Sequence, residues 1–152
     1  MSIKEEVEVL RAIPLFSKME PAKLKLLAFT SQRLTFESGQ PLFSQGDPGD
    51  AAYIVLEGEA DVSINTPQGP VKVATAGRHA IIGEVAILCD VPRTATVVAR
   101  SRLTTLRIDK DLFFRLVNEF PQMAVEIMRE LARRLEKTNE QLRAAVTRAG
   151  AA

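Results

Sequence analysis

The middle of the chain, residues 31 to 108, alternates short apolar runs with turn-forming residues. The runs lie at residues 33–36, 52–56, 60–64, 71–74, 96–99 and 103–108, and the turn signals between them at 37–39, 46–50, 57–59 and 67–70. Strands this short, at close and regular spacing, are typical of a sandwich or barrel. This segment therefore predicts a β-structure of jelly-roll type, which needs further elements to cover its apolar faces.

Helical patterns flank this segment on both sides. Apolar residues recur at helical spacing in residues 3–10, and Pro21 suits the first position of a second short helix. After the β-segment, Asp109 is a good N-cap, and Pro121 opens a final helix expected to run to about residue 147. The predicted order is helices, a β-roll, then two helices, in the α+β class.

Composition excludes several classes of function. The 152 residues include 20 Lys and Arg against 19 Asp and Glu, a formal net charge of +1. The densest basic stretch, residues 129–137, is interrupted by Glu130 and Glu136 and is typical of a solvated helix face. We therefore expect no nucleic-acid partner, which would need a concentrated basic face. No apolar run approaches the roughly 20 residues of a membrane span. The single Cys89 permits no intrachain disulfide, which favours a cytoplasmic location.

Two charged residues, Glu84 and Arg93, stand among apolar and small neighbours in residues 81 to 99. Gly83 precedes a short helical turn, where the missing Cβ allows a ligand to approach closely. Arg93 leads into a strand of small and β-branched residues, and a guanidinium buried there needs an anionic partner. That partner is either Glu84 or a phosphate, and a phosphate would leave Glu84 free to accept from a sugar hydroxyl. The alternative is a weak ion pair between two surface side chains.

This stretch resembles the phosphate-binding cassette of the cyclic nucleotide-binding domain family. The positions that carry the resemblance are Ile82-Gly83-Glu84, the apolar residues 85–88, and Pro92-Arg93-Thr94-Ala95-Thr96-Val97. Further landmarks are Pro14-Leu15-Phe16, Gln45-Gly46-Asp47 and Tyr53-Ile54-Val55-Leu56-Glu57-Gly58, so the likeness covers about residues 13 to 135. It implies a β-roll of about eight antiparallel strands with N-terminal helices, a short cassette helix and two C-terminal helices.

The resemblance also implies a role for individual residues. Glu84 would accept from the ribose 2′-OH, and Arg93 would pair with the equatorial oxygen of the cyclic phosphate. Thr94 would reach a phosphate oxygen, the base, or both. The remaining expected contacts are Gly83, Val85 and Ala86 along the sugar-phosphate, and Val62 and Ala74 toward the purine. Ala95 is also expected to bind the nucleotide. The expected ligand is cAMP, with cGMP left open because a threonine after the arginine permits both in this family.

One segment departs from the family pattern. The family usually has Gly-Asp-(Phe/Tyr)-Phe before Gly-Glu, whereas this chain has His79-Ala80-Ile81-Ile82. The change alters the turn before the cassette but removes no group expected to contact the ligand. We therefore expect a working site.

Nothing in the sequence predicts catalysis. His79 is the only histidine, which excludes a multi-histidine metal site, and no Ser-His-Asp set or pair of catalytic carboxylates is visible. Cys89 has no neighbouring base to activate it. We expect no enzyme activity, no metal and no catalytic cofactor.

The last helix carries a second pattern. Positions 124, 128, 131, 135, 138, 142 and 145 follow the spacing of a heptad seam, which predicts a homodimer through a two-stranded coiled coil. The alternative is that residues 124–135 pack on the β-roll and the remainder is unpaired. We divide the chain into a cyclic nucleotide-binding domain, residues 1–135, and a helical extension and tail, residues 136–152.

Three interpretations of the whole chain follow. The first is a sensing module that transmits ligand binding through its C-terminal helices. The second is a degenerate module that dimerises and binds no nucleotide, and the third is a ligand-binding domain cut from a larger channel or regulator. Few residues follow position 135, so we expect no helix-turn-helix region. The effector protein is not identified by any feature of the sequence.

Overall fold

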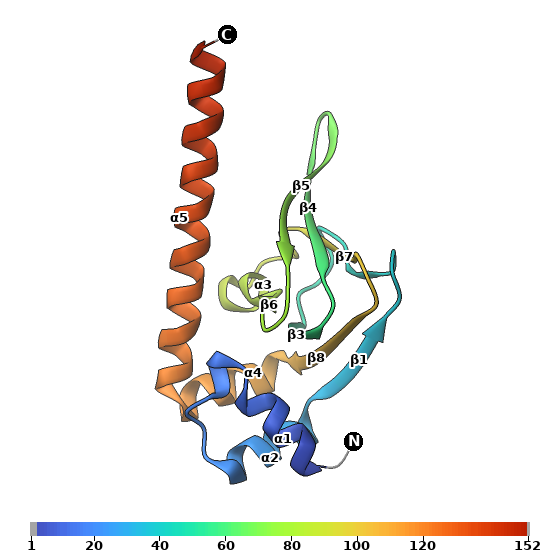
Figure 1. The fold of residues 1–152 in the computed structure, drawn as a ribbon, viewed down its shortest axis with the longest axis vertical. Coiled ribbons are helices and arrows are strands. Elements are labelled where there is room, and N and C mark those ends of the chain that lie inside the picture. Colours follow the sequence, from blue (N-terminus) through green and yellow to red (C-terminus); the bar gives the residue numbers. More distant parts are fainter. Residues whose placement is uncertain (1–2, 152) are drawn as a thin grey trace.

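Eight antiparallel strands form two four-stranded sheets in the computed structural model, which describes residues 3 to 151 (Figure 1). One sheet has the order β1-β8-β3-β6 and the other β2-β7-β4-β5. The strands are β1 (Gln32–Phe36), β2 (Pro41–Phe43), β3 (Ala51–Glu57), β4 (Ala60–Thr66), β5 (Gly69–Ala76), β6 (Ile81–Ile82), β7 (Thr96–Ala99) and β8 (Leu103–Asp109). The predicted β-roll is confirmed, and β2 and β6 are the two strands that the sequence pattern did not locate.

Strand β3 forms part of two separate cores, which explains its continuous apolar sequence. Because strand side chains alternate between faces, Ala52, Ile54 and Leu56 pack in the core shared with the helices. Tyr53 and Val55 point the other way, into the interior of the roll. β3 therefore joins the helical layer to the wall of the roll.

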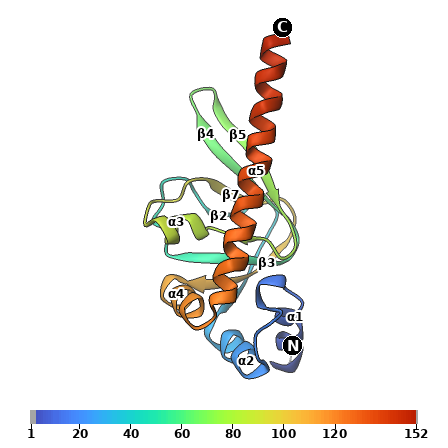
Figure 2. The same cartoon turned by 90° about the vertical axis from the view of Figure 1, so that its left-hand side faces the viewer.

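The helices lie at one end and along one side of the roll (Figure 2). The N-terminal elements are α1 (Ile3–Arg11), the 3-10 turn η1 (Pro14–Phe16) and α2 (Pro21–Thr30), and the later helices are α3 (Glu84–Cys89), α4 (Lys110–Glu119) and α5 (Pro121–Ala151). The predicted N-cap at Asp109 is present, because its Oδ1 accepts from the Leu112 amide at 2.9 Å. In residues 3 to 151, no helix is long and apolar enough to cross a bilayer.

Helix α5 packs on the body of the protein only through its first part. Met123 and Ile127 are buried in the helical core and Leu131 is half-buried, whereas residues 135 to 150 are all exposed. The helix continues without a break through position 135 and ends beyond the predicted residue 147. The division of the chain at that position stays a prediction, and residues 1, 2 and 152 lie outside the described part.

Candidate functional site

Gly83 enters the short helix α3 with a left-handed backbone, φ +86°. A Cβ at this position would lie 2.5 Å from Arg93 Nη1 and 3.2 Å from the Ala51 carbonyl oxygen. Any side chain here is therefore opposed both by the backbone conformation and by the guanidinium. From the sequence, the missing Cβ was expected to allow a ligand to approach; in the structure it makes room for Arg93.

The Arg93 side chain is buried, at 3% exposure, and is held mainly by backbone carbonyls. Its Nη1 donates to Gly83 O at 2.9 Å, and its Nη2 donates to Ala51 O at 2.7 Å. The Asp50 carboxylate lies 3.6 Å from Nη2 but is itself largely exposed. The ring of Phe43 covers the guanidinium, with its centroid 4.1 Å from Cζ. Among the described side chains, Arg93 Nε is the buried polar atom without a hydrogen-bond partner.

The buried guanidinium keeps its positive charge. Burial lowers the pKa of Arg93, while Tyr53 and Asp50 act in the opposite direction, and an arginine remains protonated even so. The sequence left Glu84 or a phosphate as the anionic partner. The pairing with Glu84 is wrong: the nearby carboxylate is the exposed Asp50, and Glu84 pairs with another arginine. The phosphate stays a prediction.

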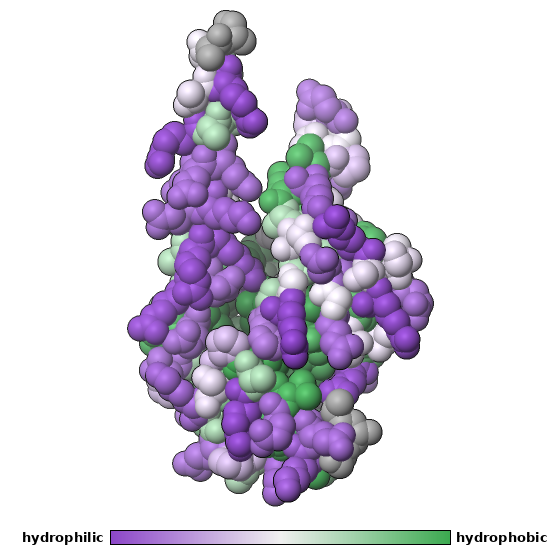
Figure 3. All heavy atoms as spheres, in the orientation of Figure 1, coloured by the Kyte–Doolittle hydropathy of each residue, from purple (hydrophilic) through white to green (hydrophobic). Residues whose placement is uncertain are grey.

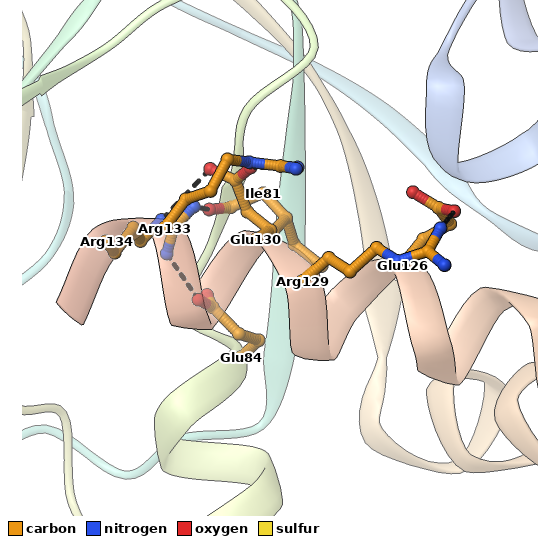
Figure 4. A network of polar contacts seen from close by, with 7 residues as sticks. All are labelled: Ile81, Glu84, Glu126, Arg129, Glu130, Arg133 and Arg134. Carbon is orange, nitrogen blue, oxygen red and sulfur yellow. Dashed lines mark hydrogen bonds and ion pairs between the residues drawn. The ribbon is translucent and has the colours of Figure 1, made fainter. Parts of the chain in front are cut away.

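Glu84 is fully buried, at 1% exposure, and its partner comes from the last helix. Arg134 on α5 donates through Nη1 to Glu84 Oε1 and through Nη2 to the Ile81 carbonyl (Figure 4). Burial raises the pKa of Glu84, and the charge of Arg134 opposes that shift. The interpretation of residues 129–137 as a wholly solvated face is therefore wrong at Arg134, which ties α5 to the cassette.

A cavity of about 490 Å³ lies between the cassette, the roll and α5. Figure 3 shows the surface hollowed between α5 and the β4–β5 hairpin. All nine residues predicted for the site line this cavity: Val62, Ala74, Gly83, Glu84, Val85, Ala86, Arg93, Thr94 and Ala95. The fold thus brings together residues of β4, β5 and the cassette. Their contacts with a ligand stay predictions.

Sequence reasoning missed two parts of the cavity wall. One is Phe43, on the short strand β2. The other is a polar face of α5 that includes Glu130, Arg134, Thr138 and Gln141. These four follow a spacing of 4, 4 and 3, which places them on one side of a helix. That periodicity was available as a signal, but nothing local indicated that this side faces the cassette.

The turn before the cassette contains a second left-handed residue. His79, where the resembling family has glycine, adopts φ 72°, and its amide donates to Val55 O at 2.7 Å. Cys89 is free and exposed. Within residues 3 to 151, no group of three or more His, Cys, Asp or Glu residues could hold a metal ion.

Comparisons with known proteins agree with this geometry. The family model described as "Cyclic nucleotide-binding domain" matches residues 33–120. The chain is similar to a CRP-like cAMP-activated global transcriptional regulator of Mycobacterium tuberculosis, with 29% identity over 136 residues, or 89% of this chain and 61% of the regulator. It is also similar to a cAMP-dependent protein kinase regulatory subunit of Aspergillus niger, with 35% identity over 108 residues, or 71% of this chain and 26% of the subunit.

Among solved structures, the catabolite activator protein of Thermus thermophilus matches with a TM-score of 0.74 and 29% identity, over 85% of this chain and 61% of that one. The present chain therefore spans less than two thirds of the length of these relatives. The relatives named here are regulatory proteins.

Proposed function

This chain belongs to the cyclic nucleotide-binding domain family, and on that premise we propose that it is a sensing module for a cyclic nucleotide, cAMP in preference to cGMP. The observation that carries the proposal is the buried, unpaired Nε of Arg93 in the wall of a 490 Å³ cavity. A buried donor on a charged group without an acceptor is costly. A phosphate entering the cavity would supply the missing acceptor.

The arrangement of Arg93 suits a cyclic phosphate. The carbonyls of Gly83 and Ala51 already take one N–H from each terminal nitrogen. The Nε–H and one further N–H on each terminal nitrogen remain, and a pair of guanidinium N–H groups can bind an anion in bidentate fashion. A phosphate would thus add acceptors to the two carbonyls that hold the guanidinium.

Glu84 and Arg134 suggest how binding is transmitted. Arg134 engages Glu84 Oε1, and a carboxylate has further lone pairs with which it can accept from a ribose hydroxyl. A ligand on Glu84 therefore acts on the same carboxylate that holds α5. Binding shifts the position of α5 if the ligand has higher affinity for one arrangement of this helix than for another.

The preference for cAMP rests on two of the relatives, the Mycobacterium tuberculosis regulator and the Aspergillus niger subunit, which are named for cAMP. Thr94 lines the cavity and leaves cGMP as the competing ligand. A competition titration in which cGMP binds tenfold more tightly than cAMP would reverse the preference.

Calorimetric titration of Arg93→Ala with cAMP and cGMP tests the proposal. The variant should lose about 2–5 kcal/mol of binding free energy, the usual cost of removing one partner of a buried, hydrogen-bonded charge pair. Arg102→Ala is the matched control, because Arg102 is exposed and pairs with Glu37 across 3.7 Å. Affinity in Arg93→Ala equal to that of the wild type would overturn the assignment. If neither cAMP nor cGMP raises the thermal midpoint of the wild-type protein, the degenerate module is favoured.

We also propose that α5 forms a homodimer contact, because it presents an unpartnered apolar stripe. Met128, Leu135 and Leu142 recur every seven residues and are about 60% exposed, at 60%, 62% and 62%. Repeats of seven place these side chains along one seam. Leu135→Glu combined with Leu142→Glu should yield a monomer in sedimentation velocity, while the exposed Glu140→Ala leaves the oligomeric state unchanged. A wild-type monomer at all concentrations would end the proposal.

A further inference from the structure

Phe43 lies at the end of β2 and lines the cavity beside Arg93. Its ring centroid is 4.1 Å from the guanidinium carbon, within the range of a cation–π contact. The ring packs against the core of the roll, but the phosphate contact described above does not by itself require an aromatic residue there. The question is what the ring contributes to the site.

The chain directly after Phe43 holds the backbone of Arg93. Asp47 Oδ2 accepts from the Ser44 amide at 2.9 Å and closes a turn. From this turn, the Gly46 amide donates to Arg93 O at 2.9 Å, and Asp47 O accepts from the Arg93 amide at 2.8 Å. Residues 43–47 therefore hold both parts of Arg93: its backbone through two hydrogen bonds, and its side chain through the Phe43 ring.

The side-chain contacts of Arg93 are of two kinds. The carbonyls of Gly83 and Ala51 accept from the two terminal nitrogens of the guanidinium. The guanidinium carbon also lies over the Phe43 ring, and this contact adds a further restraint on rotation of the group. Restricting that rotation keeps the unpaired Nε–H directed at one place.

We propose that Phe43 is a positioning residue for anion binding: its ring orients the Arg93 guanidinium so that the Nε–H faces the phosphate site. The inference rests on the proposed function and deepens it. The ring is itself supported within the roll, because Tyr53 packs against it at 6.0 Å between centroids, and Phe36 packs on Tyr53 in turn at 6.4 Å.

Graded fluorination of the ring tests the proposal with little change in shape. Mono-, di- and trifluorophenylalanine at position 43 progressively remove the negative face of the ring, and the affinity for cAMP should fall stepwise, by about tenfold overall. The same series at Phe36 is the matched control, since that ring belongs to the same aromatic cluster but lies outside the cavity lining. Phe43→Trp should retain affinity and Phe43→Leu should lose it.

A flat affinity series at position 43, or an equal fall at position 36, would overturn the proposal while leaving cyclic nucleotide binding intact. A wild type that binds neither cAMP nor cGMP would instead refute the proposed function.

Nuclear magnetic resonance of the ligand-free protein then decides the role of Phe43 separately. The wild type should show upfield-shifted Arg93 side-chain protons and slow rotation about the Nε–Cζ bond. Both features should disappear in Phe43→Leu, and their persistence in that variant would reject the positioning role.

Discussion

Replacing Arg134 by Met removes the charge that neutralises a buried carboxylate. Glu84 is 1% exposed, and Arg134 is its ion-pair partner in the folded protein. Methionine keeps much of the length and the apolar stem of arginine but offers no donor. The variant therefore leaves Glu84 buried and without its cation.

The cost follows from the exposure of the two partners. Breaking a fully buried pair by removing one side costs about 3–5 kcal/mol. The Arg134 side chain is 39% exposed, so solvent screens the interaction. We therefore expect a smaller loss in the free energy of unfolding, about 1–2 kcal/mol. For a chain of 152 residues this corresponds to a fall in Tm of about 3–6 °C.

The loss of stability caused by Arg134→Met should depend on pH. Burial raises the pKa of Glu84 and Arg134 opposes the shift, so the variant's folded-state pKa lies higher still. As the pH falls, the folded variant binds a proton at a higher pH than the unfolded chain does. The loss in its free energy of unfolding relative to the wild type is therefore largest above the folded-state pKa. As the pH falls through that value, Glu84 becomes neutral and the deficit shrinks. Thermal unfolding followed by circular dichroism at pH 8 and pH 5 measures the difference.

Two controls separate the buried charge from other losses. Arg133→Met removes a neighbouring arginine that is 66% exposed and pairs with Glu130, and it should change the Tm little. Arg134→Met in a Glu84→Gln background should lose most of its effect, because no carboxylate remains to be neutralised. A deficit that is equal at both pH values, or undiminished in the Glu84→Gln background, would refute the reasoning.

Two further substitutions test backbone features beside the cavity. Gly83→Ala should cost at least about 2 kcal/mol of stability and abolish tight cAMP binding, because the new Cβ meets Arg93 Nη1 at 2.5 Å and Ala51 O at 3.2 Å with φ at +86°. Gly77→Ala, with open space around it, is the control, and an equal loss there would contradict the argument. His79→Gly should stabilise the protein by about 0.5–1 kcal/mol, because it relieves a left-handed residue at φ 72°. Chemical denaturation measures it, and a gain of the same size in His79→Ala would show that backbone strain is not the cause.

Most of the secondary structure was predictable because its signals are local. The apolar alternation located six strands, and Asp109 was recognisable as an N-cap from its side chain alone. The two strands not located, β2 and β6, have three and two residues. A period of two cannot be read from so few positions, and these strands exist because their partners in β7 and β3 hold them.

The cassette was predictable for a different reason. Gly83, Glu84 and Arg93 lie within eleven residues of one another, so their combination stands out in the sequence. The partners of the two charges lie far away along the chain. Arg93 finds the Ala51 carbonyl 42 residues upstream, and Glu84 finds Arg134 50 residues downstream.

The sequence thus predicted which residues line the cavity, because Gly83, Glu84 and Arg93 stand together among apolar neighbours. The sequence does not reveal which residue is the ion-pair partner of each buried charge. That assignment depends on how α5 lies against the roll, a matter of packing by Met123 and Ile127 at its first turns. Short-range patterns record backbone conformation and burial, whereas ion pairing between distant segments depends on the three-dimensional distance between them. For that reason Arg134 has the pattern of a solvated helix residue in the sequence and is part of the site in the fold.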